Sequence, residues 1–170
     1  GATLVPFSTW CTESELEFLI EDSAVTWLFT VERFGEQIFT EVLARLHAAG
    51  RTAALRHLVC IDGIGRAGFE PYACMADGPV LAPLPPGEGP TASDPLVMLY
   101  TSGSSNRPKS VPLLHYAAIE NGFNIGERQG LLPDDRVLVS VPLFWAYAAV
   151  NALPAVLSHR ATLVLQSHFE

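Results

Sequence analysis

Cysteine is scarce in this sequence, and the few cysteines are not spaced for metal binding. Cys11, Cys60 and Cys74 are an odd number, lie far apart and include no C-x-x-C pair. This pattern argues against a disulfide framework and a zinc site, and it favours a reduced, cytoplasmic protein. The histidines also lack the paired spacing of metal ligands. No metal site is predicted from His47, His57, His115, His159 and His168.

Positive charge and long apolar runs are scarce as well. The chain has 10 lysines and arginines against 18 acidic residues, which gives a formal net charge of −8. Because no basic patch interleaved with aromatic residues occurs, nucleic acid is an unsuitable partner. No apolar run reaches the roughly 18 residues that a transmembrane helix needs, and no signal peptide is visible. The sequence therefore predicts no membrane-spanning segment.

The composition that remains is typical of a buried α/β protein, with 49% hydrophobic and 16% charged residues among 170. In residues 1–90, apolar runs predict strands at residues 3–7, 25–30 and 57–61. A Thr12-x-x-Glu15 capping box begins a helix after the first strand, and a helix over residues 35–49 follows the second. This order predicts a βαβαβ unit with parallel strands. A Pro/Gly-rich connection over residues 62–94 comes next.

Residues 91–170 continue the alternation of strands and helices. Strands are predicted at residues 96–100, 111–114, 136–141 and 161–165. Gly122 and Gly126 lie on one side of a helix predicted over residues 115–129, where they allow close packing. A helix over residues 143–157 is apolar all round and is therefore expected to be buried. Residues 1–90 and 91–170 are thus two portions of a parallel-rich α/β fold with helices packed on sheets.

A loop rich in hydroxyls and glycine follows the strand at residues 96–100 and ends in a cation. It consists of Thr101, Ser102, Gly103, Ser104, Ser105, Asn106, Arg107, Pro108 and Lys109. Backbone amides and hydroxyls donate hydrogen bonds and a lysine neutralises charge, so this composition suits an anionic phosphate. The P-loop of ATPases, G-x-x-x-x-G-K-[ST], fits less well. Pro108 has no N–H where that loop needs its second glycine, and Pro112 favours an extended backbone just after the lysine.

The same stretch resembles the phosphate loop of the adenylate-forming superfamily, which comprises acyl- and aryl-CoA ligases, luciferases and peptide-synthetase adenylation domains. Nine positions between Tyr100 and Val111 match the superfamily pattern Y-T-S-G-[ST]-[ST]-G-x-P-K-G-V. Asn106 and Ser110 replace two glycines of that pattern, and Arg160 replaces a third at a later turn. Asparagine tolerates a left-handed backbone better than most residues, so Asn106 is compatible with the turn, whereas a left-handed backbone at Ser110 would cost roughly 1–2 kcal/mol. The replacements bear on affinity and turnover rather than on fold.

A second resemblance lies in Pro142-Leu143-Phe144-Trp145, which is similar to the superfamily stretch P-[LM]-F-[HDW]. It implies that Phe144, Trp145 and Tyr147 shape the pocket for the acid. An apolar ring at Trp145 suits an acyl or aryl group better than the ammonium of an amino acid, which needs a carboxylate.

Together the resemblances imply part of the amino-terminal domain of an AMP-forming acyl-CoA or aryl-CoA synthetase. Such an enzyme uses ATP with Mg²⁺ to convert a carboxylic acid into an acyl-adenylate, and it then transfers the acyl group to CoA. The loop from Thr101 to Lys109 would hold the phosphates, with Lys109 as the catalytic residue that steadies the β- and γ-phosphates. The partners implied are the small-molecule acid, ATP, and CoA or a carrier protein.

Two alternatives stay open. One is a peptide-synthetase adenylation domain, and the other is a nucleotide-binding or interaction module whose ligase activity has decayed. The chain opens inside an apolar strand and is about a third as long as the enzymes it resembles. We therefore expect a piece of one larger AMP-binding domain that forms no acyl-CoA by itself.

Overall fold

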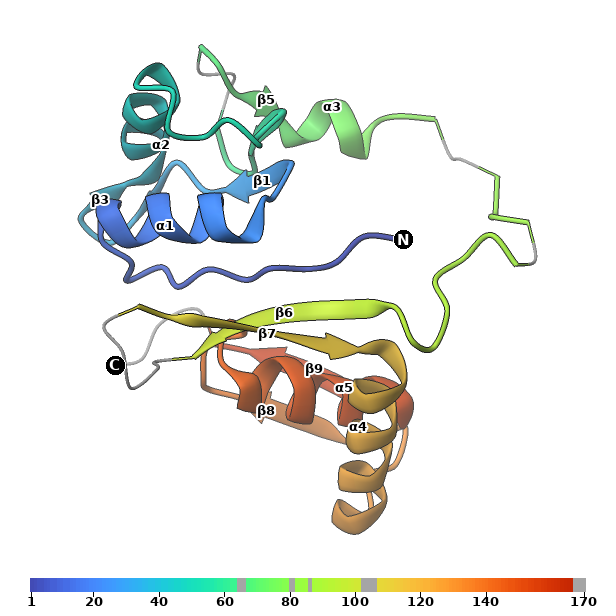
Figure 1. The fold of residues 1–170 in the computed structure, drawn as a ribbon. Coiled ribbons are helices and arrows are strands. Elements are labelled where there is room, and N and C mark those ends of the chain that lie inside the picture. Colours follow the sequence, from blue (N-terminus) through green and yellow to red (C-terminus); the bar gives the residue numbers. More distant parts are fainter. Residues whose placement is uncertain (64–66, 80–81, 86, 102–106, 167–170) are drawn as a thin grey trace. The chain divides into compact units, whose positions relative to one another are not determined.

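The computed structural model describes residues 1–63, 67–79, 82–85, 87–101 and 107–166. The chain forms two compact units, one of residues 7–83 and one of residues 1–6 with residues 84–170 (Figure 1). Within the described residues, no helix combines the length and apolar character needed to cross a membrane.

Parallel strands form the three-stranded sheet of residues 7–83, in the order β1-β4-β5. These strands are β1 (Trp27–Thr30), β4 (His57–Cys60) and β5 (Glu70–Pro71). Three helices accompany them: α1 (Glu13–Ser23), α2 (Phe39–Ala48) and α3 (Tyr72–Ala76). The most buried apolar side chains come from α1, α2 and β4, and include Leu16, Leu19, Ile20, Val42, Leu43, Leu46, Leu58 and Val59. The parallel β-α-β connection through α2 confirms the α/β class predicted from the alternation of strands and helices.

The predicted capping box begins α1. The Thr12 N–H donates to Glu15 Oε2 at 2.8 Å, and the Glu15 N–H donates to Thr12 Oγ1 at 3.3 Å. The Thr12 hydrogen bonds, that of its backbone N–H above all, hold the pKa of the Glu15 carboxyl below its ordinary value. The stabilisation from this cap is therefore present at neutral pH, and it is lost as the pH falls through that lowered pKa.

Two elements of this half of the sequence differ from the prediction. The helix expected from residue 35 begins only at Phe39, because β2 (Arg33–Phe34) and β3 (Gln37–Ile38) form a hairpin ahead of it. Gly35 turns that hairpin with a φ of +59°, which glycine adopts without steric cost. The strand expected at residues 3–7 is reduced to a parallel bridge between Leu4 and Val97. It therefore does not join the β1-β4-β5 sheet.

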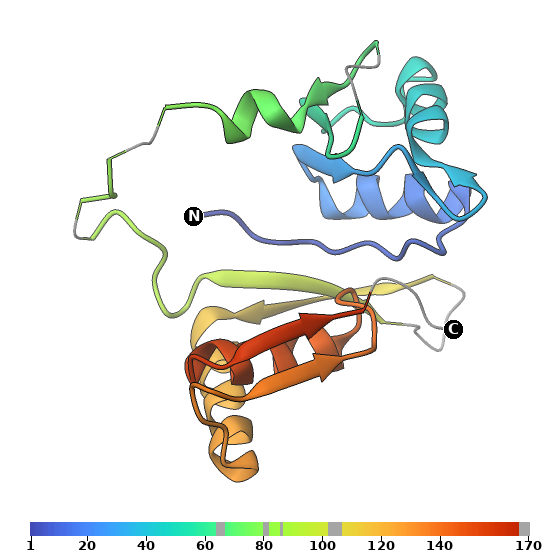
Figure 2. The ribbon, with the colours of Figure 1, turned by 180° about the vertical axis from the view of Figure 1, so that it is seen from behind.

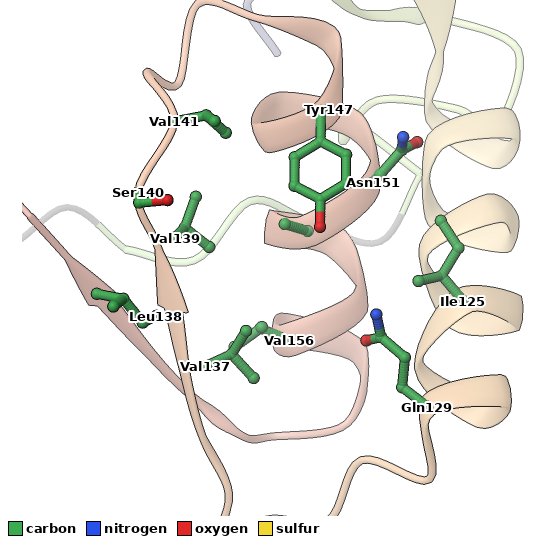
Figure 3. A pocket seen from close by; sticks show the side chains of 11 residues that line it. Ile125, Gln129, Val137, Leu138, Val139, Ser140, Val141, Tyr147, Asn151 and Val156 are labelled. Carbon is green, nitrogen blue, oxygen red and sulfur yellow. The ribbon is translucent and has the colours of Figure 1, made fainter.

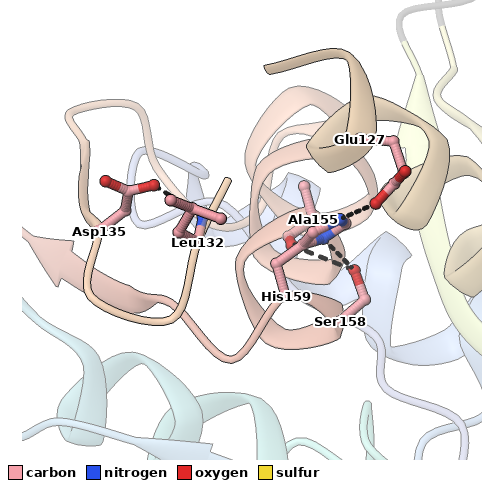
Figure 4. Close-up of polar contacts among 6 residues, drawn as sticks. All are labelled: Glu127, Leu132, Asp135, Ala155, Ser158 and His159. Carbon is pink, nitrogen blue, oxygen red and sulfur yellow. Dashed lines mark hydrogen bonds and ion pairs between the residues drawn. The ribbon is translucent and has the colours of Figure 1, made fainter. Parts of the chain in front are cut away.

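Two separate strand pairs organise the other unit (Figure 2). β6 (Pro95–Thr101) and β7 (Lys109–Leu114) form an antiparallel hairpin, whereas β8 (Arg136–Val139) and β9 (Thr162–Leu165) are parallel. α4 (His115–Gln129) follows β7 directly, over the same residues that the sequence predicts. The turn after it is fixed by Asp135, whose Oδ2 accepts from the Leu132 N–H at 2.7 Å (Figure 4).

Between β8 and β9 the chain forms a π-helical turn, η1 (Tyr147–Ala152), which runs straight into α5 (Leu153–Ser158). The sequence predicts one helix here that is buried on all sides, and that prediction is wrong. Ala148, Ala155 and Val156 are buried, but Tyr147 is 59% exposed and Leu157 64% exposed. Because this stretch is apolar at every position except Asn151, its sequence carries little information about which of its faces packs inside this unit.

The packing of α4 against α5 depends on Gly122 and Gly126, as the sequence predicts. A Cβ on Gly122 would lie 2.3 Å from Pro154 Cβ, and a Cβ on Gly126 would lie 2.3 Å from His159 Nδ1. The His159 ring stacks on Phe123 with centroids 5.2 Å apart. Its Nε2 lies 3.2 Å from Glu127 Oε1, so His159 joins the two helices (Figure 4).

Arg160 occupies a left-handed position at the end of α5, with a φ of +59°. The Ala161 N–H donates to the Val156 carbonyl at 3.0 Å and the Arg160 N–H donates to the Leu157 carbonyl at 3.2 Å. This is the Schellman arrangement, in which glycine is the usual left-handed residue. The missing glycine inferred at residue 160 thus falls at a position where the backbone favours glycine.

We expect Arg160→Gly to raise the free energy of unfolding by about 1 kcal/mol, because it removes the steric cost of a left-handed side chain. Thermal unfolding of the full-length protein measures the change. Ala24→Gly is the positive control, because Ala24 also has a left-handed backbone, with a φ of 50° at the end of α1. A lower melting temperature for Arg160→Gly would show that the arginine side chain makes contacts that outweigh the strain.

Candidate nucleotide and acid sites

The β6–β7 hairpin brings the two ends of the hydroxyl-rich loop together. Thr101 ends β6 directly opposite Lys109, which begins β7. Thr101, Arg107 and Lys109 are exposed, whereas Pro108 is half-buried. The remaining predicted phosphate-binding residues, Ser102, Gly103, Ser104, Ser105 and Asn106, lie outside the described residues. The hairpin therefore presents a hydroxyl and an ammonium at one end of a single ladder, on either side of the loop.

The backbone after Lys109 differs from that of a P-loop ATPase, in which the lysine opens a helix. Here Ser110 lies opposite Tyr100 and Pro112 lies opposite Met98 in the β6–β7 ladder. Extended geometry at this place is what Pro112 predicts. Among the described residues other than glycine, Ala24 and Arg160 have positive φ. Ser110 is therefore not strained, although the superfamily pattern has glycine there.

A pocket lined by Tyr147 lies where β8 ends, between η1 and α4 (Figure 3). Its volume is about 170 Å³. Apolar walls come from all three elements, and polar groups are contributed by Tyr147, Asn151, Gln129 and Ser140. The full lining consists of Ile125, Gln129, Val137, Leu138, Val139, Ser140, Val141, Tyr147, Asn151, Ala152 and Val156. Seven of the eleven lining side chains are apolar and four are polar. Apolar walls with a few convergent polar groups can hold and orient a small molecule.

Of the three residues predicted to shape an acid pocket, Tyr147 lines this hollow. Phe144 and Trp145 lie just ahead of η1 and outside the lining. Their rings meet edge to face with centroids 6.0 Å apart, and the Trp145 N–H donates to the Pro142 carbonyl at 3.1 Å. Trp145 is 48% exposed. The turn thus places these two rings on the segment that leads into the pocket wall.

Sequence reasoning missed Asn151, Ile125 and Gln129, which also line the pocket. Asn151 follows Tyr147 by four positions, a spacing that places two side chains on one helical face. A polar residue at that spacing inside an otherwise apolar helix was the available signal. The contribution of α4 had no such signal, because it depends on how α4 packs against η1 in space.

In the part of the chain that the structure describes, no group of three His, Cys, Asp or Glu side chains could hold a metal ion. An ion that accompanies ATP is held largely by phosphate oxygens and water. None of the described residues is therefore assigned to Mg²⁺.

The whole chain matches the family model of the AMP-binding enzymes, over residues 1–170. It is 29% identical over 175 residues to the acyl-CoA ligase sidI of Aspergillus fumigatus, covering 98% of this chain and 30% of the relative. It is 30% identical over 172 residues to an indoleacetate–CoA ligase of Aromatoleum aromaticum, covering 100% of this chain and 31% of the relative. The chain thus spans about a third of the length of these relatives.

Solved structures agree in fold. An anthranilate CoA ligase in complex with anthranoyl-AMP superposes with a TM-score of 0.85 at 21% identity, covering 99% of this chain and 31% of that one. Apo MatB from Rhodopseudomonas palustris superposes with a TM-score of 0.74 at 20% identity, covering 99% of this chain and 30% of that one. With the phosphate-loop pattern on the β6–β7 hairpin and a family match from end to end, this chain belongs to the AMP-binding enzyme family.

Proposed function

We propose that the protein containing this chain is an AMP-forming ligase that activates a carboxylic acid as its acyl-adenylate and passes the acyl group to CoA. The observation that carries this proposal is the nine-position match between Tyr100 and Val111. The loop inside this match begins and ends at the Thr101–Lys109 pair. The names of relatives support it, because two of those that match nearly the whole chain are CoA ligases.

The proposed reaction has two halves. A carboxylate oxygen attacks the α-phosphorus of ATP, the bond from that phosphorus to its bridging oxygen breaks, and pyrophosphate leaves. The CoA sulfur then attacks the acyl carbonyl, its proton is released, and AMP leaves. In the first half, Thr101 and the loop amides would donate hydrogen bonds to the phosphates. The Lys109 ammonium would offset the negative charge on the departing pyrophosphate.

The proposed acid site is the pocket of η1, β8 and α4. Its walls at Ile125, Val137 and Val156 would exclude water from an acyl or aryl group. Tyr147 would border that group. Phe144 and Trp145, on the segment that precedes η1, would close the entrance. In this arrangement the chain acts by positioning its substrates rather than by forming a covalent bond with them.

Acid-dependent pyrophosphate release by the full-length protein tests the proposal, with mass spectrometry to identify the acyl-CoA. We expect Tyr147→Ala to raise the KM for the acid about tenfold while the KM for ATP changes less than about twofold. Tyr116→Ala is the matched control, because Tyr116 is 53% exposed on α4 and does not line the pocket. An equal rise in both KM values would place Tyr147 away from the acid.

One observation favours the alternative of a decayed module. Arg160 occupies a left-handed position with a φ of +59°, where the superfamily pattern has glycine. A sequence that is no longer selected for activity would accept such a replacement. If no acid releases pyrophosphate from the wild-type protein and Asn106→Gly with Ser110→Gly restores release, decay is the correct account. If pyrophosphate is released but the acyl group is accepted only by a carrier protein, the protein is a peptide-synthetase type enzyme.

A further inference from the structure

Pro154 removes a hydrogen bond from the helix that carries Tyr147. Proline has no N–H, so the carbonyl of Val150, four residues earlier, has no α-helical donor. Pro154 lies in the first turn of α5, immediately after the π-helical turn η1. A π-helical turn inside a helix is frequently found at a functional site.

Asn121 on α4 supplies a donor to that carbonyl. Its Nδ2 donates to the Val150 carbonyl oxygen at 3.0 Å and to Asn151 Oδ1 at 2.8 Å. Val150 and Asn151 are half-buried. The side chain of Asn121 therefore joins α4 to η1 at the wall of the pocket, beside the close contact between Gly122 and Pro154.

These two contacts also fix the orientation of the Asn151 amide. A backbone carbonyl only accepts hydrogen bonds, so the nitrogen of Asn121 must be the atom that faces Val150. The second hydrogen of this nitrogen then requires the oxygen of Asn151 as its acceptor. The NH₂ group of Asn151 is consequently left to donate elsewhere, and Asn151 lines the pocket together with the Tyr147 hydroxyl (Figure 3).

We infer that Asn121 is a positioning residue that holds η1 and turns the Asn151 NH₂ group toward the pocket, which selects acids that carry an oxygen acceptor beyond their carboxylate. This inference rests on the proposed ligase function. Suitable acceptors are a ring hydroxyl, an ether or a carbonyl on an otherwise apolar or aryl acid. Ile125, Val137 and Val156 in the same lining carry no donor, and the other donors of the pocket are the Tyr147 and Ser140 hydroxyls and the Gln129 amide.

Pyrophosphate release by the full-length protein is measured with pairs of aryl acids that differ only by a methoxy or hydroxyl group. We expect the wild-type protein to favour the oxygen-bearing acid about tenfold in kcat/KM, the effect of about one hydrogen bond. Asn121→Asp keeps the shape of the side chain but can donate to neither Val150 nor Asn151. In this variant the ratio is expected to fall to near one, with the KM for ATP changed less than about twofold.

Asn124→Ala is the matched control. Asn124 is exposed on the same helix, and its side chain makes no hydrogen bond within the described residues. It is expected to keep the wild-type ratio. If the Asn121→Asp variant does not fold, Asn121→Ala replaces it in the same assay.

A double-mutant cycle with Pro154→Ala, which supplies the missing N–H, measures separately how much the hydrogen bond from Asn121 to the Val150 carbonyl contributes to stability. There Asn121→Ala is expected to lower the melting temperature less than in the wild-type background.

Each outcome is decisive. A wild-type protein that releases no pyrophosphate with any acid overturns the proposed function, and the selective role of Asn121 fails with it. A wild-type protein that is active without preference within the acid pairs overturns this inference alone. The same holds if preference survives in both Asn121 variants, because Asn121 would then affect stability and not recognition.

Discussion

Gly122→Ala is expected to destabilise the chain by about 2 kcal/mol or more, although alanine is the better helix former by about 1 kcal/mol. The added Cβ would lie 2.3 Å from Pro154 Cβ, 2.7 Å from the Pro154 carbonyl carbon and 2.8 Å from the Ala155 nitrogen. Two of these three atoms are backbone, so no side-chain rotation relieves the overlap. α4 and α5 would have to separate, which would disturb Asn121 and the pocket behind it.

Thermal unfolding of the full-length protein measures this effect, and two other glycines make it interpretable. In Gly126→Ala the added Cβ would lie 2.3 Å from the His159 ring. This ring is a side chain, so it can move away, but it then loses its contacts with Glu127 and Ser158. In Gly130→Ala the added Cβ would have no atom within 4 Å, so the only cost is that of a side chain at a left-handed φ of +66°. We expect the loss to be largest at Gly122. A melting temperature raised by Gly122→Ala would mean that the helices are not closely packed.

Lys109→Ala is expected to lower kcat/KM for ATP in pyrophosphate release about 100-fold in the full-length protein. Removal of a charged donor from a phosphate site costs about 3 kcal/mol. Lys109 is the only lysine of this sequence. The KM for the acid should change little, because Lys109 lies at the loop end of the β6–β7 hairpin and does not line the pocket.

Arg128→Ala is the control for loss of a positive charge, since Arg128 is exposed in the last turn of α4. It should leave the KM for ATP unchanged. Lys109→Arg keeps the charge but not the compact ammonium, and is expected to recover part of the activity. If Lys109→Ala releases pyrophosphate at the wild-type rate, the lysine is a surface residue and the phosphate-loop assignment fails.

The elements that local chemistry determines could be predicted from the sequence. The Thr12–Glu15 cap is predicted correctly because a capping box marks it, and α4 is predicted over residues 115–129, where Gly130 ends it. The β2–β3 hairpin was missed because Gly35 can turn a chain inside what looks like helical periodicity. The strand at residues 3–7 was placed in the wrong sheet, since pairing partners are a matter of tertiary structure.

The two candidate sites also differ in whether local sequence or tertiary structure brings their residues together. The candidate phosphate loop is predicted from a contiguous pattern of residues, whereas the proposed acid pocket draws on α4, β8 and η1, which are apart in sequence. Tyr147 is proposed for the pocket from a resemblance, but Asn121 contacts the pocket wall through Val150 and Asn151, about thirty positions away. No pattern in one sequence identifies a contact of that range. The π-helical turn was missed because periodicity does not separate it from an α-helix with a proline.

The Thr101–Lys109 pair has a consequence for the entropy of nucleotide binding. Because these two residues face each other in the ladder, both ends of the proposed phosphate-binding segment are held together before any ligand arrives. The entropy lost on bringing these two ends together is therefore incurred when the hairpin folds and not when a nucleotide binds. Weakening the ladder well away from the loop, at the Leu99–Val111 pair for example, should then reduce nucleotide affinity without removing any group that touches a phosphate.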